Sequence, residues 1–153
     1  MSDATLAGLH HVKLPVSDLR RSVEWYRRVL DLVVEYEFPD EDGVVRGVAG
    51  RVPGLGDCGF ALRENPESAR GFRGFDPLCF GIADQAAAQA WAAKLDDLGI
   101  EHSPVIEATI GWIVSCHDPD GTEIRFYSWA GPEQDHVDEP GYAHMVRVAS
   151  PQN

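Results

Sequence analysis

The 153-residue sequence has few cysteines and no long apolar run. Its three cysteines, Cys58, Cys79 and Cys116, are odd in number, far apart and without a C-x-x-C pair, which argues against a disulfide framework or a zinc knuckle. No apolar run approaches the ~20 residues of a bilayer crossing, and residues 1–8 lack a basic region followed by an apolar stretch. We therefore expect a cytoplasmic protein with reduced thiols and no membrane partner.

Basic residues are also scarce. Thirteen Lys and Arg residues stand against 25 Asp and Glu residues, which gives a net charge of -12 and repels phosphate backbones. Nucleic acid is therefore excluded as an expected partner. The sequence also lacks a G-x-S-x-G elbow, a Walker-type loop and a G-x-G-x-x-G turn after a strand, so the common hydrolase and nucleotide-binding motifs are missing.

An internal repeat is the most informative feature that is present. When the sequence is shifted by 66 residues, Leu14 aligns with Phe80 and Trp25 with Trp91, and the apolar residues around them also match. A chance alignment of two of the four tryptophans with matching neighbours is improbable. The repeat predicts two copies of one structural module.

Each copy has the same predicted order of elements, βαβββ. An alternating strand is followed by a capping residue, Asp18 or Ser17 in one copy and Asp84 in the other, and then by an apolar stripe of helical spacing. Gly99 is a plausible C-terminal cap for the second helix. The predicted strands are residues 11–16, 33–38, 44–49 and 58–63 in the first copy, and 78–82, 100–106, 112–116 and 123–129 in the second.

These elements predict an α+β fold of two tandem modules. The expected boundaries are a first module at 8–64, an irregular linker at 65–76, a second module at 77–130 and an acidic tail at 131–153. A lone four-stranded module would leave one sheet face wet, so we expect one domain in which a mixed sheet curls around a cleft shared by both modules. That cleft is the expected binding site.

Three passages carry a family resemblance: LHHVKLPVSDL at 9–19, SVEWY at 22–26 and DPDGTEIRF at 118–126. With the repeat, the chain resembles the vicinal oxygen chelate superfamily over residues 8–129. That superfamily includes glyoxalase I, fosfomycin resistance proteins, extradiol dioxygenases and bleomycin resistance proteins. The resemblance implies the glyoxalase/bleomycin resistance/dioxygenase fold, a small-molecule ligand and a homodimer.

The resemblance also implies a divalent metal, held by two histidines and a glutamate. In this sequence the corresponding positions are His11, Pro77 and Arg125. Only His11 can donate a lone pair, since a prolyl ring has none to offer and a guanidinium is a permanent cation. Cys79 and Glu123 are possible substitutes, but each is displaced by two residues along its strand. We therefore predict no metal and no other cofactor.

Two cations provide an alternative to the metal. Strand alternation places His11 and Lys13 on one face, and Glu123, Arg125 and Tyr127 together on the last strand. Lys13 and Arg125 would then bind an anionic or phenolic molecule. A structural alternative stays open, in which Arg125 pairs with a nearby carboxylate.

The candidate catalytic residues are His11, Glu123 and Tyr127, which could act as acids or bases without a metal. His11 could equally be a structural residue bonded to Tyr127 or a backbone carbonyl, and His10 is expected to face the helix. Trp112 and Trp129 suit either a ligand wall or the core. The predicted ligand-binding set is His11, Lys13, Cys79, Trp112, Arg125 and Tyr127.

The sequence thus predicts a metal-independent member of the family that binds a small organic molecule, for sequestration and resistance or for a metabolic step. The alternative is a metal-dependent lyase, isomerase or dioxygenase of glyoxalase type with an atypical metal site. Two roles stay open for the tail, which could cover a neighbouring subunit or the mouth of the cleft.

Overall fold

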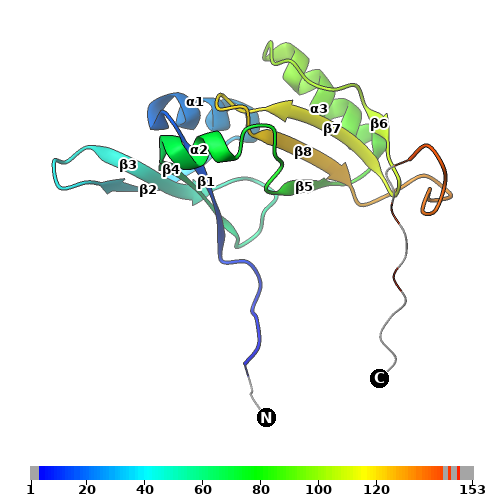
Figure 1. Ribbon diagram of the computed structural model, residues 1–153, viewed down its shortest axis with the longest axis horizontal. Helices are drawn as coiled ribbons and strands as arrows, with labels where there is room; N and C mark the ends of the chain where they lie inside the picture. Colours follow the sequence, from blue (N-terminus) through cyan, green and yellow to red (C-terminus); the bar gives the residue numbers. More distant parts are fainter. Residues whose placement is uncertain (1–3, 143–144, 146–147, 149–153) are drawn as a thin grey trace. The chain divides into compact units, whose positions relative to one another are not determined.

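The computed structural model describes residues 4–142, Met145 and Val148. The chain divides into two compact units (Figure 1). The first contains the chain up to Phe75 together with Asp118–Thr122, and the second contains Asp76–His117 and the chain from Glu123 onwards. The two four-stranded mixed sheets with their helices confirm the predicted α+β fold of two βαβββ modules.

In the first unit the strands lie in the order β1-β4-β3-β2. β1 and β4 are parallel and the other pairs are antiparallel. The parallel pair forms because β4 returns to the sheet beside the first strand of the module. The elements of this module are β1 (His11–Val16), α1 (Leu19–Leu30), β2 (Val33–Pro39), β3 (Val45–Arg51) and β4 (Gly59–Glu64).

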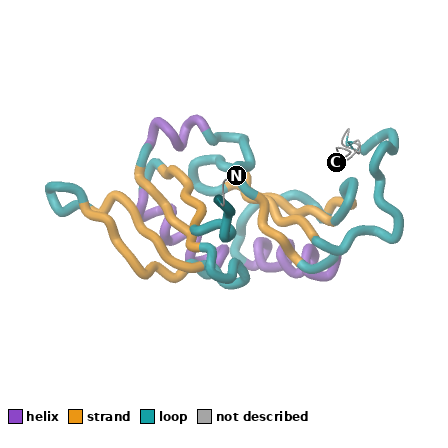
Figure 2. Tube along the Cα trace, turned by 90° about the horizontal axis from the view of Figure 1, so that it is seen from below, coloured by secondary structure: helices purple, strands orange, loops and turns teal. Residues whose placement is uncertain are grey.

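The second unit repeats this arrangement, with the strand order β5-β8-β7-β6 and a parallel β5–β8 pair. Figure 2 shows a helix lying along one face of its strands. The elements of this module are β5 (Cys79–Ile82), α3 (Gln85–Asp97), β6 (Ile106–Glu107), β7 (Trp112–His117) and β8 (Glu123–Ser128).

The two long helices begin at equivalent positions of the repeat, directly after the aspartates predicted as caps. The carboxylate of Asp18 accepts a hydrogen bond from the Arg21 backbone N–H at 3.0 Å, and that of Asp84 accepts one from the Ala87 N–H at 2.9 Å. Each cap satisfies a backbone donor that the first helical turn would leave unbonded. Gly99 follows the end of α3 with a φ of 68°, as a C-terminal glycine does.

One face of the first sheet packs against α1. Phe60 of β4 contacts the ring of Tyr26 of α1 with centroids 5.4 Å apart, and Leu14, Val16 and Leu62 are buried. Residues alternate along a strand, so the other face carries the residues between these, of which Lys13 and Arg63 are exposed and Ala61 is buried. This second face is free of α1 and is where a ligand could lie.

Two predicted elements differ from the structure. The segment predicted as an irregular linker contains a helix, α2 (Pro66–Gly71), because Asn65 caps it through the Ser68 N–H at 3.0 Å and proline suits its first turn. The strand predicted at residues 100–106 is reduced to β6 and to an isolated bridge between His102 and Cys116.

The turn between β7 and β8 belongs to the first unit, although its sequence lies in the second repeat. The Tyr26 hydroxyl donates a hydrogen bond to Asp118 Oδ2 at 2.8 Å in a buried position. The backbone N–H of Ser17 donates to Asp120 at 3.0 Å, and the Ser17 hydroxyl bonds to the same carboxylate. These contacts anchor the turn to α1 and to the end of β1.

In the described part of the chain, no helix is long and apolar enough to cross a membrane. The acidic tail predicted at 131–153 is described as far as residue 142 and at two later positions. The remaining tail residues, 143–144, 146–147 and 149–153, lie outside the described part, and so does much of the segment to which the two tail roles were assigned.

Candidate functional site

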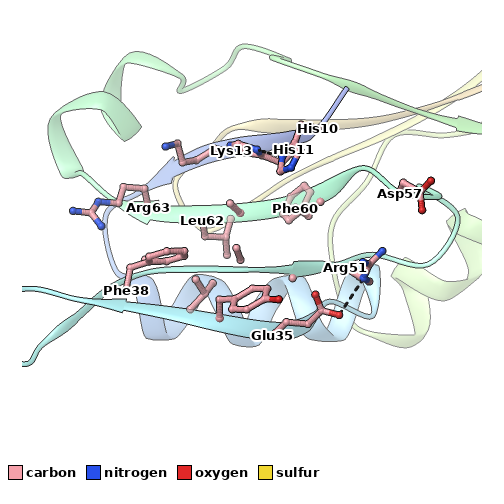
Figure 3. A pocket seen from close by; sticks show the side chains of 17 residues that line it. His10, His11, Lys13, Glu35, Phe38, Arg51, Asp57, Phe60, Leu62 and Arg63 are labelled. Atoms are coloured by element: carbon pink, nitrogen blue, oxygen red, sulfur yellow. Dashed lines mark hydrogen bonds and ion pairs between the residues drawn. The ribbon is translucent and has the colours of Figure 1, made fainter. Parts of the chain in front are cut away.

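A cavity of about 600 Å³ lies on the first sheet, and residues of the first unit alone line it (Figure 3). This volume is within the range of small-molecule sites. All four strands contribute, together with His10 directly before β1 and Asp57 two residues before β4.

The strand register explains how the cavity is built. Lys13, Ala61, Ala49 and Tyr36 are successive partners across the four strands, so they form one row on the same face. The middle of the row has alanine side chains only, while a lysine and a tyrosine stand at the two outer strands. The cavity is therefore hollowed over β3 and β4, where the side chains are small, and is bordered by larger side chains over β1 and β2.

The cavity has two ends of different charge. Lys13, Arg63 and Phe38 lie toward one end, and Arg51 and two acidic side chains lie toward the other (Figure 3). Arg51 Nε bonds to Glu35 Oε1 at 3.1 Å, which neutralises both groups. Within the described residues, neither Lys13 nor Arg63 has an ion pair or a side-chain hydrogen bond. One end of the cavity therefore carries two cations without a counter-charge.

Two histidines lie between these ends. Nδ1 of His10 and Nδ1 of His11 are 2.9 Å apart, so one ring donates a hydrogen bond to the other. Both side chains line the cavity. The prediction that His10 faces the helix is wrong, because the residue precedes β1 and is not bound by its alternation. In the described part of the first unit, the side-chain hydrogen bond of His11 is the one with His10.

In the second unit, Arg125 pairs with carboxylates, which is the structural alternative given for it in the sequence analysis. Its guanidinium pairs with Asp76 at 3.4 Å and with Glu123 at 3.2 Å, and it is one-third exposed. The same contacts engage Glu123, one of the candidate acid–base residues. Arg125 is therefore not a free cation for an anionic ligand.

The other predicted site residues of the second unit have structural partners of their own. The Tyr127 hydroxyl accepts a hydrogen bond from the Ile110 backbone N–H at 3.3 Å. Trp112 is half-buried, and its backbone N–H donates to Ser128 Oγ at 2.8 Å. Cys79 is exposed, and partial burial of its sulfur raises the pKa of the thiol, in spite of the neighbouring Arg125. A thiol that stays protonated is a poor nucleophile and a poor metal ligand.

The prediction that Trp129 could lie in the core is wrong. Its side chain is 85% exposed, and it lies against Gly81, where a Cβ atom would come within 2.3 Å of the indole nitrogen. The predictions of catalytic and ligand-binding roles for this unit stay predictions.

The positions that the family resemblance assigns to a metal do not fit a divalent ion. His11 supplies one imidazole, Pro77 supplies no donor, and Arg125 supplies a cation already engaged by two carboxylates. Among the described residues there is also no group of three or more His, Cys, Asp or Glu side chains close enough to hold a metal.

Sequence reasoning missed most of the cavity residues, among them Arg63, Tyr36 and Phe38. Arg63 could have been found, since it lies two residues after Ala61 and therefore points to the same face as Lys13. Tyr36 and Phe38 could not be assigned to a face, because the register of β2 with β3 shifts between Val34 and Tyr36.

Comparisons with known proteins identify the family and the fold. The family model described as the Glyoxalase/Bleomycin resistance protein/Dioxygenase superfamily matches residues 8–126. No curated protein sequence has significant similarity to the chain.

Many solved structures share the fold. An antibiotic binding protein from Streptomyces sp. CB03234 is 20% identical, with a TM-score of 0.65 over 82% of this chain and 98% of that one. A glyoxylase/bleomycin resistance protein/dioxygenase domain from Frankia sp. EAN1pec is 25% identical, with a TM-score of 0.63 over 84% and 100%. A fosfomycin resistance protein from Listeria monocytogenes, in complex with Mn(II) and dihydroxypropylphosphonic acid, is 17% identical, with a TM-score of 0.64 over 84% and 96%.

Proposed function

This chain belongs to the Glyoxalase/Bleomycin resistance protein/Dioxygenase superfamily, and on that premise we propose that it binds a small organic anion without a resident metal. The binding site is the cavity of the first sheet. The observation that carries the proposal is the pair of cations, Lys13 and Arg63, which have no counter-charge in the described part of the chain. Both residues are exposed, so an anionic ligand can reach them and form a charge-assisted hydrogen bond with each.

The proposed role is sequestration rather than catalysis. Of the three acid–base candidates, only His11 lines the cavity, while Glu123 is engaged by Arg125 and the Tyr127 hydroxyl by a backbone N–H. The name of one structural neighbour, an antibiotic binding protein, is consistent with a binding role.

Calorimetry in EDTA tests this function, with 2-naphthoate and octanoate as probe anions. We expect binding that persists in EDTA and that weakens about tenfold or more in Lys13→Met and in Arg63→Met, because each variant removes a charge-assisted hydrogen bond. Lys94→Met is the matched control, since Lys94 lies over the Trp91 ring in the second unit. Equal affinity in all variants would contradict the proposal.

Metal analysis of protein purified without a chelator tests the proposal that the site holds no resident metal. One tightly held divalent ion per chain would favour the glyoxalase-like enzyme with an atypical metal site instead. A homodimer is part of the proposal by family resemblance alone, and sedimentation of the purified chain tests it.

A further inference from the structure

The uncompensated cations lie beside an aromatic side chain. Arg63 extends over Gly47, where a Cβ atom would lie 3.3 Å from Arg63 Nη1 and 3.4 Å from Cδ. Phe38 is the partner of Gly47 across the β2–β3 pair, so it borders the same glycine from the other side. Figure 3 shows Arg63, Phe38 and Lys13 at the same end of the cavity. When the guanidinium of Arg63 binds the anionic group of a ligand, the rest of that ligand is therefore within reach of the phenyl ring of Phe38.

The aromatic side chains at this border are unusually exposed. Phe38 is 50% exposed and Tyr36 is 64% exposed, and both line the cavity. Large aromatic rings that stay in water on a sheet face are unfavourable, and a ligand ring that covers them recovers the lost burial.

The space between the borders suits a flat molecule. The row that joins Lys13 to Tyr36 passes over Ala61 and Ala49, whose side chains end at Cβ. A planar ring can lie on these residues with its edge toward the cations, while a bulky saturated group makes fewer contacts there.

From this juxtaposition we propose that the anion is an aromatic carboxylate. Its carboxylate binds Arg63 in a bidentate manner and contacts Lys13, and its ring stacks against Phe38 and toward Tyr36. A guanidinium matches the planar geometry of a carboxylate, and stacked aromatic pairs prefer centroids 4.5–7 Å apart. This inference rests on the proposed function and narrows its ligand class.

Three probes separate the two parts of the site: 2-naphthoate carries ring and charge, octanoate carries charge alone, and 2-naphthalenemethanol carries the ring alone. In calorimetry we expect 2-naphthoate to bind about tenfold or more tightly than either of the others. Phe38→Leu should weaken 2-naphthoate by about two- to tenfold and leave octanoate unchanged. Val33→Leu is the matched control, an exposed apolar position on the same strand that does not line the cavity.

The outcomes distinguish this inference from the proposed function. If octanoate binds as tightly as 2-naphthoate and Phe38→Leu affects neither, the aromatic class is wrong and anion binding stands. If neither anion binds, both proposals fail. If Phe38→Leu changes the sedimenting mass instead of the affinity, the aromatic border is a contact between copies of the chain and the inference is overturned. Circular dichroism and urea unfolding of each variant verify that it is folded.

Discussion

A buried carboxylate illustrates how single residues fix the fold. Asp118 accepts hydrogen bonds from the Tyr26 hydroxyl and, through Oδ1, from the N–H groups of Asp120 and Thr122. Burial raises the pKa of Asp118, while these three hydrogen bonds act in the opposite direction. The three donors thus favour the ionised form of a carboxyl group whose burial disfavours it.

Removing one donor tests this dependence. We expect Tyr26→Phe to lower the free energy of unfolding by about 1–3 kcal/mol at pH 7, because the buried carboxylate loses a charge-assisted hydrogen bond. Urea unfolding followed by tryptophan fluorescence measures the change. Tyr36→Phe is the control, since Tyr36 is exposed and its loss should change the stability by less than about 0.5 kcal/mol. Equal stability of wild type and Tyr26→Phe would contradict this account.

Individual site residues were predictable where strand parity alone decided their position. His11 and Lys13 share a face because they are two residues apart on β1, and the same parity extends to Arg63 on β4. For Arg125, the pairing with Glu123 two residues away was within reach of the sequence, but the second partner, Asp76, was not, since it lies far away in the sequence in a loop before β5. Local pattern does not determine which carboxylate a loop brings to a strand.

At the scale of elements, the aspartate caps account for the equivalent starts of α1 and α3. We expect Asp18→Ala and Asp84→Ala each to lower the free energy of unfolding by about 0.5–2 kcal/mol, because a backbone N–H of the first turn loses its acceptor. Denaturant unfolding measures the loss. Asp84→Ser keeps an acceptor and should retain most of the stability, so a serine variant as unstable as the alanine variant would argue against capping.

The C-terminal segment is attached through a histidine between two carboxylates. His136 bonds through Nε2 to Glu107 of β6 at 2.9 Å and through Nδ1 to Glu139, and its ring stacks on Tyr142 with centroids 3.8 Å apart. Bonds to two carboxylates require both ring nitrogens to be protonated. The hydrogen bonds to Glu107 and Glu139 accordingly raise the pKa of His136.

This raised pKa predicts a pH-dependent attachment. The stabilisation is complete below the pKa of an unfolded histidine, about 6.5, and is lost as the pH rises through the higher folded value. We expect amide hydrogen exchange at residues 136–142, corrected for the intrinsic effect of pH, to be slower at pH 6 than at pH 9. His136→Gln should abolish the difference, and His117→Gln, at an exposed histidine, should preserve it. If the pH dependence came instead from other acidic side chains, Asp135 and Asp138 included, the exchange rates of His136→Gln would depend on pH as those of the wild type do. That outcome would contradict the role of His136.

The elements themselves were predictable to different degrees. The long helices have local signals, namely a cap and an apolar stripe, and their start positions followed from the caps. The helix α2 was missed because Asn65-Pro66 also signals a turn, although asparagine as cap and proline in the first turn favour a helix start. The strand β6 is short because only two of its residues pair with β7. The local pattern of residues 100–106 does not indicate how far this pairing extends.

At the scale of the whole molecule, the net charge of -12 opposes the cations of the cavity. An approaching anion meets repulsion at long range and attraction only near Lys13 and Arg63. Salt shortens the screening length from ~30 Å at 0.01 M to ~8 Å at 0.15 M and so removes mainly the distant repulsion.

We therefore expect the association rate constant of 2-naphthoate to rise about twofold or more over this range of salt, as measured by stopped-flow fluorescence. The rate constant of neutral 2-naphthalenemethanol should not change. A rate constant for 2-naphthoate that falls with salt would mean that the cavity cations dominate the field even at a distance.

The turn at Asp118–Thr122 means that the two repeats are not interchangeable building blocks. A fragment ending at Phe75 would contain every strand of the first sheet, yet Tyr26 would lack the carboxylate that accepts its hydroxyl hydrogen, and Ser17 would lack Asp120. A separated first half would regain these bonds only by binding the half that contains the turn. A rearranged gene that joins the first half to a foreign partner would therefore have to include the DPDG turn.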